Sequence, residues 1–220
     1  MLKRTARLGF TLLEMMVVIV IIGILSTYLV VNAPEWFDRA RMTASEKNMG
    51  RLYVHLLGYQ QNHNGSLPSE SGQRFFLRPW KDGMIEKTEQ QAIAFFSPAH
   101  TFEECLADQG LSKDDMDVVT YLNNWEAIGP GYTSYSGFTT GGDPDQRRRL
   151  SKSPGSTAIV ADAEMWHRSA LIYLTADGAT HRLLRNEIEE QTGLNLDDEE
   201  TTFKPGPGCG VKVLETVSND

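Results

Sequence analysis

The sequence lacks the short motifs that mark the common catalytic sites. Its 220 residues contain no GxSxG nucleophile elbow, no GxxxxGK[ST] phosphate loop, no CxxC pair and no HExxH helix. Basic residues are also in the minority, since 21 Lys and Arg face 29 Asp and Glu, and this balance disfavours nonspecific nucleic-acid binding. We therefore expect neither an enzyme nor a nucleic-acid partner, and the sequence points to no cofactor.

Charge is nearly absent from a long stretch near the amino terminus. Phe10–Val31 is a run of 22 residues whose only charged member is Glu14, and such a length crosses roughly 30 Å of hydrocarbon as a helix. The apolar core of a secretory signal peptide is shorter and is followed by a small-residue cleavage site, whereas here the small residue, Gly9, comes first. Basic residues precede the run and acidic residues follow it: Lys3, Arg4, Arg7, then Glu35 and Asp38. This asymmetry predicts a single-pass anchor with its amino terminus in the cytoplasm.

The stretch Gly9-Phe10-Thr11-Leu12-Leu13-Glu14, followed by Val/Ile-rich sequence, resembles the prepilin signature of type IV pilins and type II secretion pseudopilins. The resemblance implies that prepilin peptidase cleaves between Gly9 and Phe10 and then methylates the amine of Phe10. It also implies that Glu14 pairs with the terminal amine of a neighbouring subunit, because a charge in apolar surroundings is costly unless it is paired. Losing three basic residues with the leader changes the formal charge to 18 minus 29, or -11.

The same resemblance implies a location and a set of partners. The chain would be a bacterial inner-membrane protein whose carboxyl-terminal domain is periplasmic, and it would join a filament of pilin or pseudopilin subunits. Its other implied partners are the prepilin peptidase, an assembly platform protein and a motor ATPase. Cys105 and Cys209 would then occupy an oxidising compartment, where a disulfide between them is allowed; free cysteines packed as small hydrophobes are the alternative.

Three parts of the chain follow from these patterns. Residues 1–9 form the leader, residues 10–33 the transmembrane half of a long helix, and residues 34–220 a globular domain that includes the amphipathic half of that helix. Pro34 predicts a bend or a loosened hydrogen bond. Asn64-Gly65 and Pro68 predict the end of the helix at about Asn62. We expect these residues on its buried face: Phe37, Ala40, Ala44, Leu52, Leu56 and Tyr59, with Glu46, Met49 and Leu57 opposite.

The rest of the domain reads as a small antiparallel sheet beneath the helix. Strands are predicted at residues 156–162, 170–176, 179–184 and 211–217, and short helices at 89–96 and 102–109. Asp177-Gly178 between two β-prone runs predicts a hairpin with a type I′ turn. The predicted fold class is therefore α+β, a pilin fold with a long amino-terminal helix on an antiparallel sheet.

Two further features invite functional interpretations. His167, followed by nine residues and then Asp177-Gly178, resembles a feature of a large subgroup of bacterial pseudopilin-like proteins. We interpret Asp177-Gly178 as a turn in the hairpin rather than as half of a catalytic or metal pair. The runs Arg147–Arg149 and Asp197–Glu200 are expected to be solvated loops. Carboxylates in the second run would suit calcium, although four consecutive acids lack the spacing of a calcium loop, so no metal site is predicted.

Three functions are consistent with the sequence. The first is a structural subunit of a pseudopilus or pilus-like filament, used in protein secretion or at the cell surface. The second is a minor or tip subunit that binds cargo or a surface through exposed aromatic residues: Trp80, Trp125, Tyr132 and Tyr135. The third, an anchored periplasmic enzyme, predicts a cleft with perturbed carboxylates or histidines. Which machine uses the subunit is left open.

Overall fold

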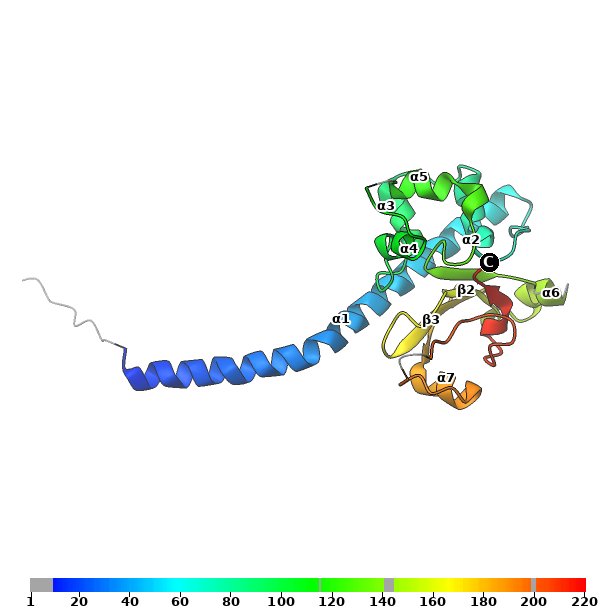
Figure 1. The fold of residues 1–220 in the computed structure, drawn as a ribbon. Helices are drawn as coiled ribbons and strands as arrows, with labels where there is room; N and C mark the ends of the chain where they lie inside the picture. The colour runs from blue at the N-terminus through cyan, green and yellow to red at the C-terminus, as the bar shows by residue number, and fades with distance from the viewer. Residues whose placement is uncertain (1–9, 115, 141–144, 199–200) are drawn as a thin grey trace, which may run out of the picture. The chain divides into compact units, whose positions relative to one another are not determined.

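A computed structural model describes residues 10–114, 116–140, 145–198 and 201–220. The chain divides into two compact units, Met1–Arg39 and Ala40–Asp220, which are described in turn. One long helix, α1 (Leu12–Asn62), contributes to both of them (Figure 1).

The first unit consists, in its described part, of the apolar half of α1. Every side chain from Phe10 to Val31 is exposed, so this apolar run has no packing partner within the unit. Within the described residues, α1 is the one helix that is long and apolar enough to cross a membrane. The helix continues through Pro34, as expected, although this residue has no N–H to donate to the carbonyl four residues earlier.

The second half of α1 packs into the globular unit along a stripe whose spacing alternates between three and four residues. Its buried members are Met42, Ser45, Met49, Leu52, Leu56 and Tyr59. The predicted face was therefore only partly right. Met49, expected on the opposite side, is fully buried, whereas Ala40 is exposed, Ala44 is half-buried and Phe37 is 66% exposed. A stripe at this spacing is typical of a helix that presents one narrow seam to its partner.

The end of α1 is as predicted. The helix stops at Asn62, and the two residues that follow His63 have positive φ, 52° at Asn64 and 79° at Gly65. Asn and Gly tolerate this left-handed conformation better than other residues, so the local sequence is sufficient to end the helix.

A five-stranded antiparallel sheet forms the centre of the second unit, in the order β4-β3-β2-β1-β5. Its strands are β1 (Tyr135–Phe138), β2 (Ala158–Asp162), β3 (Ala170–Thr175), β4 (Thr180–Leu184) and β5 (Val217–Ser218). The three strands predicted between residues 156 and 184 are confirmed. The strand predicted at 211–217 was largely wrong, because a 3-10 turn at Leu214–Thr216 leaves only two residues of β5 to pair with β1. Strand β1 was not predicted.

The β3–β4 hairpin is confirmed, but its turn differs from the predicted type. Only Gly178, at φ 90°, has positive φ there, and the amide N–H of Gly178 donates to the carbonyl of Thr175. Thr175 also pairs with Ala179, so three residues connect the strands. This is the three-residue hairpin in which a turn is followed by a left-handed glycine. The Asp177 carboxylate stabilises it by accepting from the Thr175 hydroxyl and the Ala179 amide.

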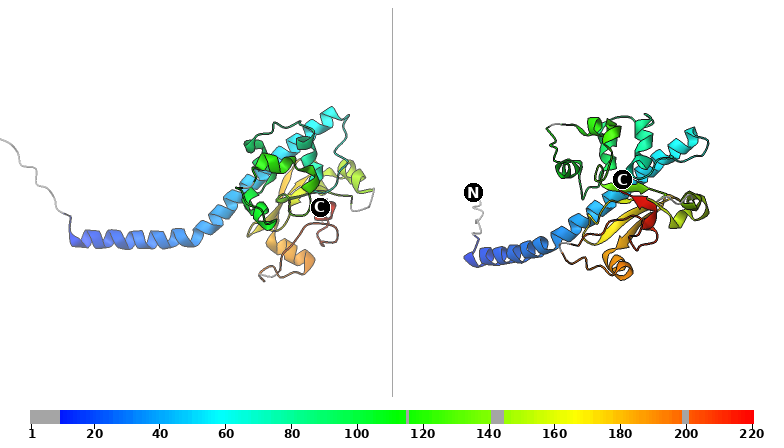
Figure 2. Two further views of the ribbon diagram at one scale, coloured as in Figure 1. Left: turned by 45° about the horizontal axis from the view of Figure 1, so that its top comes forward. Right: turned by 45° about the vertical axis from the view of Figure 1, so that its right-hand side comes forward.

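The sheet is covered on both faces, by two separate clusters of buried residues (Figures 1 and 2). One face packs on the stripe of α1 and on the helices between residues 73 and 123. The other packs on α7 and on the segment that leads to β5. Alternating residues of β3 divide between the clusters: Ile172 and Leu174 face α1, whereas Leu171 faces α7. The α+β fold predicted from the sequence is confirmed, and it fits a pilin-like fold.

The remaining helices are short: α2 (Gln73–Lys81), α3 (Glu89–Ala92), α4 (Phe102–Asp108), α5 (Val118–Asn123), α6 (Asp145–Lys152) and α7 (Arg185–Thr192). The predicted helices at 89–96 and 102–109 are α3 with its 3-10 extension, Ile93–Phe95, and α4. Aromatic residues proposed as a recognition patch are in the core instead. Trp80, Tyr132 and Tyr135 are at most 1% exposed, and Trp125 is partly buried against the same cluster.

Candidate functional site

The amino end of α1 is held by a reciprocal cap between Thr11 and Glu14. The Glu14 amide donates to the Thr11 hydroxyl oxygen at 3.2 Å, and the Thr11 amide donates to Glu14 Oε2 at 2.8 Å. The Thr11 hydroxyl also donates to Glu14 Oε2, at 2.7 Å. A Thr followed three residues later by Glu is the sequence pattern of such a capping box, and this signal could have been recognised in the sequence.

Phe10 immediately precedes the capping residue Thr11, and 72% of its surface is exposed. Gly9, the other residue of the predicted cleavage site, lies outside the described residues. The Glu14 carboxylate therefore has a local role in the single subunit, because it satisfies an amide that the first helical turn leaves without a partner. It is exposed and has no basic partner among the described contacts of the subunit.

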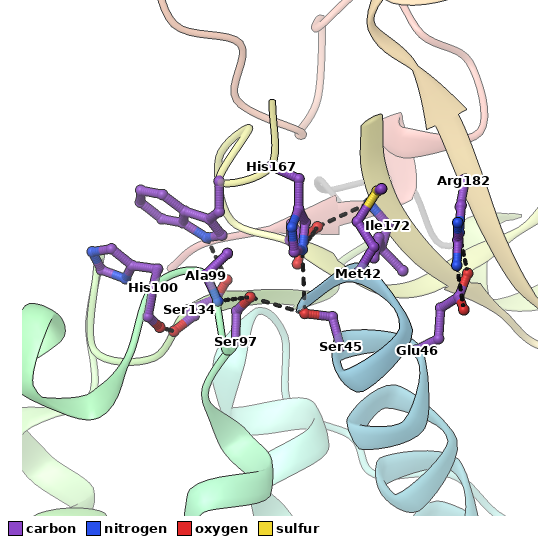
Figure 3. A network of polar contacts seen from close by, with 12 residues as sticks. Met42, Ser45, Glu46, Ser97, Ala99, His100, Ser134, His167, Ile172 and Arg182 are labelled. Atoms are coloured by element: carbon purple, nitrogen blue, oxygen red, sulfur yellow. Dashed lines mark hydrogen bonds and ion pairs between the residues drawn. The ribbon is translucent and has the colours of Figure 1, made fainter. Parts of the chain in front are cut away.

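In the second unit, α1 is attached to the sheet by a buried polar network that includes His167 (Figure 3). The Ser45 hydroxyl of α1 lies 3.3 Å from His167 Nε2 and 2.9 Å from the Ser97 hydroxyl. Ser97 in turn accepts from the Ala99 amide at 3.2 Å. All three side chains, Ser45, Ser97 and His167, are at most 2% exposed. Buried polar groups are stabilising only when they are hydrogen-bonded, so the network fixes which residue of α1 faces the loop after β2.

Asp162, at the end of β2, lies next to His167 of this network and is fully buried. Its Oδ2 accepts from the Ile172 amide at 2.8 Å and is 4.0 Å from His167 Nε2, while its Oδ1 has no hydrogen-bond partner. Burial raises the pKa of Asp162 well above its ordinary value, because the charged form loses its solvation, and the Ile172 amide offsets only part of this effect.

Two further contacts attach α1 to the β3–β4 hairpin. Arg182 of β4 donates to both carboxylate oxygens of Glu46, at 2.6 and 2.9 Å. Farther along the helix, the Tyr53 ring packs against Gly178, where a Cβ atom would come within 2.4 Å of the ring. His167 and Gly178 therefore contact α1 at positions eight residues apart, about 12 Å along a helix axis.

This arrangement explains the spacing between His167 and Asp177-Gly178 without a catalytic or metal pair. His167 contacts Ser45 of α1, and Gly178 contacts Tyr53 of the same helix. The Asp177 carboxylate accepts a hydrogen bond within its own turn. The hairpin role expected for Asp177-Gly178 is consistent with these contacts. The Ser45–His167 contact was not predicted, and no local pattern could have indicated it, since 122 residues separate the partners.

The comparison with protein families decides what the amino-terminal site is. The model of the family described as the prokaryotic N-terminal methylation motif matches residues 4–30, which include Phe10, Thr11 and Glu14. The chain carries a prepilin-type signature. No curated protein and no solved structure matched the chain.

The prepilin-type signature is that of structural subunits, and two clusters that resemble catalytic triads do not have the required properties. In the first, Ser45 and Asp162 both approach Nε2 of His167, whereas a triad needs its serine and its acid on opposite ring nitrogens. The whole cluster is also buried, so no substrate can reach the hydroxyl.

In the second cluster a thiol, an imidazole and a carboxylate contact one another in the order of a catalytic triad, but the thiol is unreactive. Cys105 Sγ lies 3.4 Å from His100 Nδ1, and His100 Nε2 lies 3.1 Å from the Asp108 carboxylate. The ring of His100 stacks on Trp166 with 3.8 Å between their centroids. However, Cys105 is 0% exposed, and burial raises its pKa to about 12. A nucleophilic thiol needs a lowered pKa and access to solvent, so this cluster has a packing role.

The disulfide allowed by the sequence is not formed. Cys105 and Cys209 are both free, and they belong to the clusters on opposite faces of the sheet. A disulfide needs Cα atoms within about 7 Å, and a sheet layer separates these two residues. The alternative, cysteines packed as small hydrophobes, describes both of them.

The run Arg147–Arg149 lies in helix α6 rather than in the expected loop, and side chains of both charged runs form local contacts. Arg147 donates to the Pro68 carbonyl at 2.7 Å, and Arg148 pairs with Asp145 within α6. In the acidic run, Asp197 lies 3.3 Å from Arg185, while residues 199 and 200 lie outside the described residues. Among the described residues, no group of three or more His, Cys, Asp or Glu side chains is arranged to hold a metal ion.

Proposed function

We propose that the chain is a structural subunit of a pilin-like filament rather than an enzyme, inserted in the inner membrane by Phe10–Val31 before assembly. The observation that carries the proposal is the prepilin-type signature, joined directly to a helix whose apolar half is fully exposed in the single chain. Exposed apolar surface of this extent requires a membrane or other subunits to cover it. In a filament, neighbouring subunits would cover this surface after the chain has left the membrane.

The processing steps proposed from the signature involve the chain's first residues. Prepilin peptidase would cut between Gly9 and Phe10 and methylate the new amine of Phe10. The exposed position of Phe10, ahead of the capped helix, supports access of an enzyme to that junction. The Glu14 carboxylate would then pair with the amine of an adjacent copy. Orientation with the amino terminus in the cytoplasm, a periplasmic domain, and use of a platform protein and motor ATPase complete the proposal.

Intact mass and amino-terminal sequencing of the membrane-extracted chain test this proposal, in the native host and in a strain without prepilin peptidase activity. We expect a chain that begins at methylated Phe10 only when the peptidase is active. A chain that begins at Met1 in both strains would contradict the proposal and would leave an ordinary membrane anchor.

A minor or tip subunit that binds cargo is the second candidate function. Burial of Trp80, Tyr132 and Tyr135 removes the aromatic patch on which this candidate rested. The region between α3 and α5 nevertheless carries an apolar pocket lined by Ile93, Phe96 and Phe102.

A further inference from the structure

An apolar pocket of about 360 Å³ opens between α3, α4 and the start of α5. Its floor is formed by Phe96, Phe102 and Val118, each at most 6% exposed, and Ile93 at its rim is 49% exposed. Pockets of a few hundred Å³ with apolar walls are typical of sites that receive a compact apolar group. The pocket adjoins α1, because Asn48 of that helix lines it and donates to the Phe96 carbonyl at 3.0 Å. It contains no residue of the amino-terminal signature.

Negative charge predominates around the mouth of this pocket. Three carboxylates, those of Glu89, Glu103 and Asp117, line it together with one ammonium group, that of Lys113. Lys113 is engaged in an ion pair with Glu103, and Asp117 accepts from the Val119 and Thr120 amides at 3.0 Å. The mouth therefore carries two negative charges in excess, and it would favour an apolar group that is accompanied by a cation.

The chain itself offers such a group. Phe37 is 66% exposed, the largest exposed fraction among the large hydrophobic residues described after Val31. Arg39 and Arg41 follow it within four residues of the chain, and both are exposed. Arg39 pairs with Glu35 on its own helix, so the cation considered beside Phe37 is the guanidinium of Arg41. An exposed aromatic side chain near a guanidinium group has the composition of an interface anchor that enters an apolar pocket with an acidic rim.

We propose that Phe37 of a second copy of this chain docks in the pocket formed by Ile93, Phe96, Phe102 and Val118. This inference rests on the proposed function, in which copies of the chain assemble. The two surfaces are different, so the contact is head-to-tail. Every copy carries one pocket and one Phe37, and a contact of this kind repeats along an open helical assembly.

Disulfide trapping between two differently marked copies tests the contact. One full-length copy carries Phe37→Cys and the other Ile93→Cys, both with Cys209→Ser to remove the more accessible native thiol, and they are co-expressed in the native host. Both substituted positions are exposed, so the fold is expected to tolerate them. After oxidation of assembled material with copper phenanthroline, we expect a mixed dimer on a non-reducing gel, about tenfold above the control pair, because docking raises the local thiol concentration.

The matched control replaces Phe37→Cys with Val54→Cys, since Val54 lies on the same helix and is 63% exposed. A charge exchange gives a second, independent measurement. Arg41→Glu should lower the yield of the trapped dimer, and Glu89→Arg in the partner copy should restore it.

Three outcomes overturn the inference. Equal yields of trapped dimer from the Phe37 and Val54 pairs, in filaments that still depend on Glu14, would contradict the docking contact. The proposed function would not be affected. Protection of Ile93→Cys from a water-soluble maleimide without trapping to Phe37→Cys would indicate a different occupant. Failure of the wild-type chain to assemble at all, read from filament yield rather than from trapping, would overturn the proposed function and the contact with it.

Discussion

The two halves of α1 face opposite physical situations although they belong to one helix. Up to Val31 the helix is apolar on every side and no residue is covered. From Met42 onward only one residue in each three or four is buried, and the exposed surface is mostly polar, with Val54 and Leu57 as exposed apolar residues. A helix that is apolar all round needs lipid or other helices, whereas an amphipathic helix needs one partner surface.

The two halves therefore differ in where their packing partners lie. The globular unit supplies the partner of the second half through His167, Arg182 and Gly178, so that half is complete within one chain. The first half has no such partner among the described residues of its own unit. It is therefore the part whose energetics change when the chain moves from a membrane into an assembly.

The strongest test of the first half separates the charge of Glu14 from its capping role. Glu14→Gln retains an oxygen that can complete the cap, whereas Glu14→Ala removes the charge and the side-chain half of the cap and leaves only the bond from the residue-14 amide to Thr11. If the carboxylate pairs with a neighbouring amine, both variants should lower incorporation into filaments about tenfold or more, because an unpaired buried charge costs several kcal/mol. Filament yield relative to membrane-bound, processed chain is the measurement. Normal assembly of the Gln variant would show that capping, not charge, is what Glu14 supplies.

For the second half of α1, the expected effect is on the stability of the globular unit, because this half is held by packing. Met49→Ala removes a fully buried side chain, and we expect it to lower the free energy of unfolding of the globular unit by about 2–5 kcal/mol. Leu57→Ala is the matched control, since Leu57 is 37% exposed on the same helix, and its effect should be small by comparison. Chemical unfolding of the detergent-solubilised chain, followed by tryptophan fluorescence, compares them. Equal losses in the two variants would contradict the observed stripe.

Adding a single methyl group at Gly178 should disturb its contact with the Tyr53 ring. Gly178→Ala combines a positive φ with a Cβ that would lie 2.4 Å from the Tyr53 ring, and we expect a loss of about 3 kcal/mol in unfolding free energy. Gly193→Ala has a similar φ, 73°, and no atom within 4 Å of the new Cβ, so backbone strain alone should cost it about 1 kcal/mol. Thermal unfolding of both variants measures the difference. Identical losses would mean that Tyr53 moves away without cost.

The last prediction concerns how stability changes with pH. The pKa of Asp162 is raised in the folded chain, so the folded state binds a proton more tightly than the unfolded state does. Stability should therefore fall as the pH rises above the unfolded pKa of about 4, by at most about 1.4 kcal/mol per pH unit until the folded pKa is reached. Asp162→Asn keeps the shape and an oxygen for the Ile172 amide but cannot ionise. The difference in unfolding free energy between the Asn variant and the wild type should grow from pH 5 to pH 8, and a constant difference would contradict the shift.

Some of the fold was predictable because its signals are local. The end of α1 at Asn62 depends on Asn64 and Gly65, whose left-handed conformation is a property of those two residues. The β3–β4 hairpin was predicted from Asp177-Gly178 for the same reason, although the type of its turn was not. The capping box of Thr11 and Glu14 could have been predicted as well, because both partners lie within four residues.

Other features could not be predicted because their partners are distant in the sequence. Strand β1 pairs with β2 and β5, and its sequence, Tyr-Ser-Gly-Phe, has no strong strand signal until those neighbours are in place. The buried position of Met49 and the half-buried position of Ala44 depend on what the sheet presents to α1. The fate of Cys105 and Cys209 likewise depends on which face of the sheet each one covers.

The sequence by itself determined the membrane-length apolar run, the excess of acidic residues and the prepilin-type signature, because composition and short-range spacing are complete in a contiguous segment. Tertiary structure alone decided that His167 contacts Ser45, that the sheet is covered on both faces, and that the aromatic residues of the middle region are core. Each of these depends on the burial of groups that are tens of residues apart, and burial is a property of the packed chain rather than of any one segment.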